Sequence, residues 1–135
     1  EGSYTHSHLQ ACYNCGEILP DPSSDTGGIL GYADHYSATE DCINYGKVHH
    51  GNVGVGTRKS SAIIDVVDIY FLKDTGKTWR VDDDNVFTED EMSTQSNFKG
   101  LNWTEHWVMG YSAYSSSKQH PVLQNCPFQN ISWEK

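Results

Sequence analysis

One long apolar stretch, residues 61–73, constrains the fold of this chain more than any other feature. Five of the seven residues at positions 63–69 are Val or Ile, which disfavour a helix because branching at Cβ restricts the side chain there. Apolar residues also occupy both alternating faces of the stretch. We therefore predict a strand that is covered on two sides.

A turn-like sequence follows this stretch directly. Asp74 suits the start of a tight turn, and Gly76 tolerates the positive φ that hairpin turns require. Residues 78–82 would return as a second strand, with Trp79 and Val81 on one face. The pattern predicts a hairpin at the centre of the fold.

Composition indicates a chain of short strands joined by turns. The 135 residues correspond to one domain by length, and Tyr and Gly are plentiful, at 8 and 12 residues. The predicted class is mainly β: a single-domain antiparallel β-sandwich or compact β-rich domain over 1–135, with a short helix at most. Residues 1–8 are polar and are expected to form an extended N-terminal arm.

Shorter elements can be placed along the rest of the chain. Strands are predicted at 29–36, 42–48 and 107–114, with a turn at 38–41. Thr88 followed by three acidic residues resembles a helix start, so one short helix is expected at 89–95. We find no internal repeat and no second domain.

The net charge of the chain limits the classes of partner that it can bind. The net charge of −9 and the pI near 5.0 argue against nucleic acid, which requires a basic surface. No apolar run reaches the roughly 18 residues that a membrane span needs. The chain begins with Glu1, as it would after removal of a signal peptide or at a trimmed boundary.

The cysteines and two glycosylation sequons favour an extracellular protein. Cys12, Cys15, Cys42 and Cys126 are even in number, and we expect them to form structural disulfides, with three pairings open. The sequons begin at Asn102 and Asn130. Secretion is the predicted localisation.

Metal binding has two candidate sources. The acidic cluster Asp82, Asp83, Asp84 and Glu89 offers hard oxygen ligands for Ca²⁺, although its spacing is not that of an EF-hand and a solvated acidic turn is the alternative. The seven histidines include two close pairs, 6/8 and 49/50, which could join a zinc or copper site. Without an HExxH motif, exposed loop histidines are the default interpretation.

Catalytic motifs are weak. Residues 110–114, GYSAY, approach an esterase elbow around Ser112 but lack its closing Gly and lie in a predicted strand. Asp65 and Asp68 interrupt the apolar stretch, yet a regular strand would point them to opposite faces. Neither pattern defines a reaction.

Aromatic residues give the leading functional hypothesis. Trp103, Trp107, Tyr111 and Tyr114 lie close together in sequence, and such rings commonly hold sugars or protein surfaces. We expect a lectin-like binding or adhesion domain that recognises a glycan or protein surface, with Ca²⁺ as a candidate cofactor. The alternatives are a self-associating structural subunit and a small secreted hydrolase.

Overall fold

The computed structural model describes residues 7–19, 25–33, 36–58, 64–78 and 83–126. Within them the chain is built mainly of strands, with one short α-helix and two 3-10 turns. In chain order the elements are β1 (Ser7–Gln10), β2 (Tyr13–Asn14), β3 (Leu30–Ala33), β4 (Ser37–Asn44), β5 (Val55–Arg58), β6 (Ile64–Leu72), η1 (Asp83–Asn85), β7 (Val86–Phe87), α1 (Glu89–Met92), η2 (Gln95–Asn97), β8 (Trp107–Gly110) and β9 (His120–Leu123).

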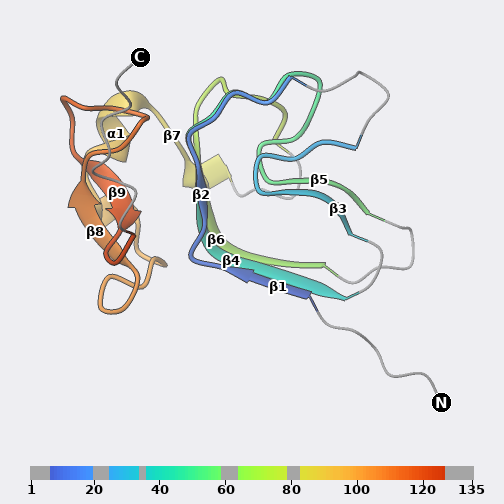
Figure 1. Cartoon of the computed structure of the whole chain (residues 1–135), viewed down its shortest axis with the longest axis horizontal. Coiled ribbons are helices and arrows are strands. Elements are labelled where there is room, and N and C mark those ends of the chain that lie inside the picture. Colours follow the sequence, from blue (N-terminus) through green and yellow to red (C-terminus); the bar gives the residue numbers. More distant parts are fainter. Residues whose placement is uncertain (1–6, 20–24, 34–35, 59–63, 79–82, 127–135) are drawn as a thin grey trace.

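The first half of the chain winds into stacked coils. The main sheet has the order β1-β4-β6-β7, with β2 also pairing β4, and every one of these pairs is parallel. β3 and β5 form a second parallel pair, which lies across the coil from β1, β4 and β6 (Figure 1). Parallel bridges, such as Ile18 with Val48, continue the stacking between the two sheets. Each coil therefore rests in register on the next, as in solenoid proteins.

The prediction of a small β-rich domain is confirmed, but the antiparallel sandwich is not, because the main sheet is parallel. The central strand is present as β6, and both of its recorded neighbours run parallel to it. After the turn at Asp74, Lys77 forms a parallel bridge with Asn52. Residues 79–82 of the predicted returning strand lie outside the described part. The turn residues thus lead to the next side of the coil, and turn chemistry alone did not reveal that direction.

The coils contain a repeated motif that our sequence analysis missed. Residues 12–18 and 42–48 share the pattern C-x-N-x-G-x-(I/V), and the structure places Tyr13 opposite Ile43. Asn14 Nδ2 donates to Asn44 Oδ1 at 2.9 Å, which makes a ladder between the coils. Each of the two amides also donates to the carbonyl oxygen two residues further on, of Gly16 or Gly46. A Cβ atom at Gly46 would collide with the Gly16 carbonyl, so this position requires glycine.

A bend recurs at one position of each coil. Ala11, Asp41 and Asp68 all have positive φ, at 54°, 56° and 52°. The strand registers place these three residues side by side, since Glu40 pairs with Val67 and Cys42 with Ile69. Asp is one of the residue types that tolerate this conformation, which explains why Asp68 interrupts the apolar strand. The predicted turn at 38–41 was wrong: β4 runs through it, and only Asp41 bends the chain.

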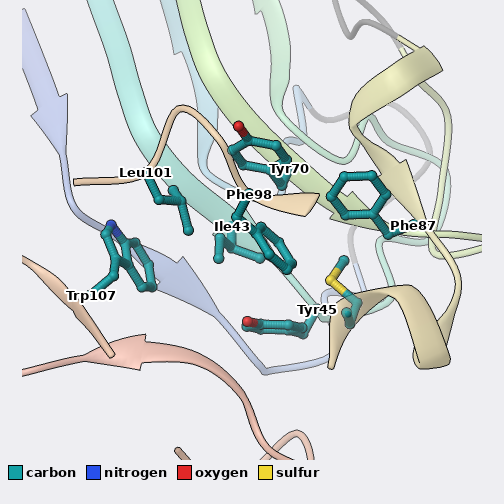
Figure 2. Packing of buried hydrophobic residues seen from close by; sticks show 8 residues of the cluster. Ile43, Tyr45, Tyr70, Phe87, Phe98, Leu101 and Trp107 are labelled. Atoms are coloured by element: carbon teal, nitrogen blue, oxygen red, sulfur yellow. The ribbon is translucent and has the colours of Figure 1, made fainter. Parts of the chain in front are cut away.

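The bend gives each coil two outward faces. Inside the coil, buried side chains include Cys42, Val53, Ile69 and Phe71. After the bend, the outward side chains are covered by the C-terminal segment in a second core (Figure 2). The members of this core are Ile43, Tyr45, Tyr70, Phe87, Met92, Phe98, Leu101 and Trp107. Before the bend, none of the described segments covers the outward face, where the side chains of His8, Gln10, Asp65 and Val67 are exposed.

Apart from β7, which pairs with β6 in the main sheet, the C-terminal segment, residues 83–126, is built from local structure. The predicted helix start is confirmed: Thr88 accepts a hydrogen bond from the Glu91 amide, and the Glu91 side chain accepts one from the Thr88 amide. β8 and β9 form an antiparallel pair. β8 ends at Gly110, four residues before the predicted end of that strand. None of the described helices is long and apolar enough to cross a membrane.

Candidate functional site: a polar groove on the open sheet face

The open sheet face consists of the outward side chains of β1, β4 and β6 that precede the bend. They are His8 and Gln10 from β1, Ala38 and Glu40 from β4, and Asp65 and Val67 from β6. With the neighbouring Tyr36, most of this face lines a groove of about 400 Å³. Parallel pairing positions these residues, because it brings together side chains about 30 residues apart in the chain.

Two carboxylates of the groove are held by hydrogen bonds. Glu40 Oε1 lies 3.0 Å from His8 Nε2 and accepts a hydrogen bond of 3.0 Å from Gln10 Nε2. The Tyr36 hydroxyl donates to Asp65 Oδ2 at 2.6 Å. This bond and the charge of Asp65 raise the pKa of Tyr36, which strengthens the preference for the protonated phenol. The groove therefore offers acceptors and donors side by side.

One large apolar side chain accompanies these polar groups. The side chain of Val67 is half exposed on the same face, beside the carboxylate of Asp65. Two carboxylates near a single histidine make the groove unfavourable for anionic ligands. A neutral ligand rich in hydroxyl groups can donate to the carboxylates and lay an apolar surface on Val67.

The predicted aromatic residues do not form a shared surface. Trp107 is 1% exposed and lies in the core between coils and C-terminal segment (Figure 2). Trp103 and Tyr114 are partly buried against that core, and Trp103 Nε1 donates to the Phe98 carbonyl. Of the four, Tyr111 is the one with an exposed side chain. Clustering in sequence here reflects packing, because large rings are needed to fill the junction.

The acidic cluster is not assembled into a metal site in the part of the chain that is described. Asp84 and Glu89 are exposed, Asp82 lies outside the described residues, and the side chain of Asp83 is not described. Among all described His, Cys, Asp and Glu residues, no group of three or more lies close enough to hold a metal ion. Ca²⁺ binding at this cluster therefore stays a prediction.

The histidines are instead engaged in separate contacts. His120 is fully buried, and its Nδ1–H donates to the Lys118 carbonyl at 2.9 Å, so Nε2 accepts from the Ser112 hydroxyl at 2.6 Å. Burial lowers the pKa of His120, which keeps the ring neutral. Ser112 and His120 thus resemble the serine and histidine of a catalytic triad. The third member of a triad is a carboxylate, and here the backbone carbonyl of Lys118 occupies its place. The pair links the ends of the β8–β9 hairpin.

A second histidine joins the C-terminal segment to the bend. His106 Nδ1 lies 2.9 Å from Asp41 Oδ2, and the amide of Asn102 donates to Asp41 Oδ1 at 2.9 Å. Asp41 is 5% exposed, and its two carboxylate oxygens accept hydrogen bonds from protein donors in place of water. The bend residue is therefore a junction contact and not part of an open site.

The remaining predicted sites are placed as follows. No two cysteines lie at disulfide distance, and the disulfides remain a prediction. The Asn102 side chain is partly buried and bonds to Glu105, while Asn130 lies outside the described residues. Asp65 is in the groove, but Asp68 contacts Gly100 at the bend, so the two carboxylates do not share a site.

Sequence reasoning missed the groove residue Glu40, and it singled out His8 only as a candidate metal ligand. No local motif marks Glu40, and only the register of the coils brings it together with His8 and Val67. No family model, curated protein or solved structure matches the chain.

Proposed function

We propose that this chain is an extracellular binding or adhesion domain and that the open sheet face holds its ligand. The observation that carries the proposal is the groove with Glu40 and Asp65, each already oriented by a hydrogen-bonding neighbour. Oriented acceptors on a rigid sheet reduce the entropic cost of binding. The proposed ligand class is a neutral glycan, because its hydroxyl groups match the acceptors and its apolar ring face matches Val67.

A glycan array tests this function directly. We expect the wild-type protein to bind a subset of neutral glycans, and the double variant Glu40→Gln, Asp65→Asn to lose at least tenfold in affinity for them. Both replacements keep the shape and remove the charged acceptors. The matched control is Glu89→Gln, an exposed carboxylate away from the groove, which should bind as the wild type does. Absence of glycan binding by the wild type, or equal binding by the double variant, contradicts the proposal.

A structural subunit is the second candidate, and one observation favours it. β1 and β2 each pair with β4 alone among the described strands, so the first coil presents a strand edge. Such an edge can accept another strand and extend the stack. Light scattering over a range of protein concentrations separates the candidates: concentration-dependent growth supports assembly, and a constant monomer mass supports a binding domain.

A further inference from the structure

Cys12 and Cys42 occupy the same position in successive coils. Tyr13 pairs with Ile43, and the Ile43 amide donates to the Cys12 carbonyl at 3.0 Å. Neighbouring strands of a sheet lie about 4.8 Å apart, which falls within the Cα–Cα range of about 4.4–6.8 Å that disulfides span. The backbone at these two positions therefore meets the first requirement for a cross-link.

The two side chains also share an orientation. Each thiol donates to the carbonyl oxygen two residues upstream, Cys12 to Gln10 at 3.4 Å and Cys42 to Glu40 at 3.0 Å. Cys12 packs against the interior cluster that contains Cys42. Both sulfurs thus point into the coil, one above the other. They are not at bonding distance in this structure, and rotation about the Cα–Cβ bonds would have to bring them together.

The other cysteines face elsewhere. Cys15 packs in the second core, where its sulfur lies 3.5 Å from the Ser112 hydroxyl. A Cys12–Cys15 bond would join side chains that point into two different cores. Burial, with smaller contributions from Cys15 and Cys126, raises the pKa of Tyr13 to about 12, so the remaining two cysteines share this residue as a neighbour.

We infer that Cys12 and Cys42 are the partners in a disulfide that staples the first coil to the second. This inference selects one of the three pairings and leaves Cys15 and Cys126 as the other two cysteines. It does not depend on the proposed binding function. Such a link stabilises the fold because it reduces the conformational freedom of the unfolded chain. The loop that it closes spans the whole first coil.

The reaction needs an oxidant of the low-molecular-weight disulfide class, such as oxidised glutathione. The Cys12 thiolate attacks one sulfur of the oxidant, forms a mixed disulfide and releases one thiol. The Cys42 thiolate then attacks the Cys12 sulfur and releases the second thiol. Two protein thiols lose two hydrogens, and one oxidant molecule is reduced to two thiols. Cys12 reacts first because Cys42 is 0% exposed.

Peptide mapping after oxidation tests the inference. The folded protein is incubated with reduced and oxidised glutathione, alkylated, and cut after Glu residues. Cleavage after Glu17 and Glu40 separates Cys42 from both Cys12 and Cys15. We expect a linked peptide pair that disappears on reduction. In the double variant Cys15→Ser, Cys126→Ser the link should persist, which assigns it to Cys12.

A matched variant completes the test. In Cys12→Ser the link should be lost, while circular dichroism reports whether the fold is kept. Cys12 is the better position to change because it is less buried than Cys42. Alkylation of all four thiols in the oxidised wild type, a Cys12–Cys15 link, or a Cys42–Cys126 link would each overturn the inference.

Discussion

The coils and the C-terminal segment are held together by different kinds of contact. In the coils, residues 7–78, the main contacts are parallel backbone pairs between residues 25 to 30 positions apart, such as Leu30 with Val55 and Tyr13 with Ile43. In the C-terminal segment, residues 83–126, β7 pairs with β6 of the coils, the other elements are local, and a core of large side chains attaches them to the coils. Repeated backbone pairing stabilises the coils, whereas the packing of large side chains stabilises the C-terminal segment.

The junction between these two regions is formed by the aromatic contacts of the second core. Tyr70 contacts Phe87 and Phe98 at centroid distances of 5.6 and 5.1 Å, and Tyr45 stacks on Tyr114 at 4.5 Å. The Tyr45 hydroxyl donates to the Pro121 carbonyl at 2.7 Å. Each of these contacts joins one coil residue to one C-terminal residue, so the junction should be the most sensitive place to remove volume.

The largest expected effect is therefore at Trp107. Trp107→Ala should lower the free energy of unfolding by about 3–5 kcal/mol, because it empties the site of a large buried ring. Trp107→Phe is the control: Trp107 Nε1 has no hydrogen-bond partner among the described residues, so Phe loses volume but no bond. Urea unfolding measures both variants. Equal losses for Ala and Phe would show that the ring does not attach the segment to the coils.

The ladder of amides should give the next largest effect. Asn44 is fully buried, and its side chain bonds to both Asn14 and the Gly46 carbonyl. Asn44→Ala should cost about 2–3 kcal/mol, since partners in a dry interior are left unsatisfied. Asn14→Ala, at the partly exposed end of the ladder, should cost less because water can replace its bonds. A larger loss at Asn14 than at Asn44 would contradict stacked coils.

A smaller effect is expected from pH at His120. Because burial lowers its pKa in the folded state, protons bind preferentially to the unfolded chain. The stabilising effect of the neutral ring is complete above the unfolded pKa of about 6.5 and is lost as pH falls towards the lower, folded pKa. His120→Gln should flatten unfolding free energy against pH between about 5 and 7, by at most about 1.4 kcal/mol per pH unit. Parallel curves for variant and wild type would contradict a buried neutral His120.

The smallest effect is expected at the exposed pair of Asp90 and Lys118. Their charged groups lie 2.7 Å apart, and Lys118 lowers the pKa of Asp90. Solvent screens this contact, so Asp90→Asn should leave the melting temperature unchanged at pH 7. Any contribution would be present above the unfolded pKa of about 3.9 and lost as pH falls through the lower, folded value. A clear loss at pH 7 would mean that the helix α1 attaches to the hairpin through charge and not through the core.

The same contrast between local structure and distant pairing separates the features that the sequence predicted from those that it did not. The helix start at Thr88 and the strand from Trp107 were predicted because their signals are local. The central strand was also identified, but its parallel partners depend on register with distant residues. The spacing between paired residues changes from 30 at Tyr13 to 27 at Ile43, so a search for a constant period does not find the repeat.

The residues of the candidate site were also hard to predict, because pairing between distant strands brings them together. Asp65 was singled out as an interruption of an apolar strand, but Glu40, which lines the same groove, carries no local signal. Trp107 was assigned to a surface because aromatic clustering looks the same in a core and in a binding face. Burial is decided by the fold, and the fold here is decided by non-local pairing.

The most direct test of this account is the register between the first two coils, measured by NMR through hydrogen bonds. We predict scalar couplings from the Ile43 amide to the Cys12 carbonyl and from the Tyr45 amide to the Asn14 carbonyl, with both residue numbers increasing together. Couplings in which one number rises while the other falls would show antiparallel strands, and would contradict the stacked coils and the groove built on them.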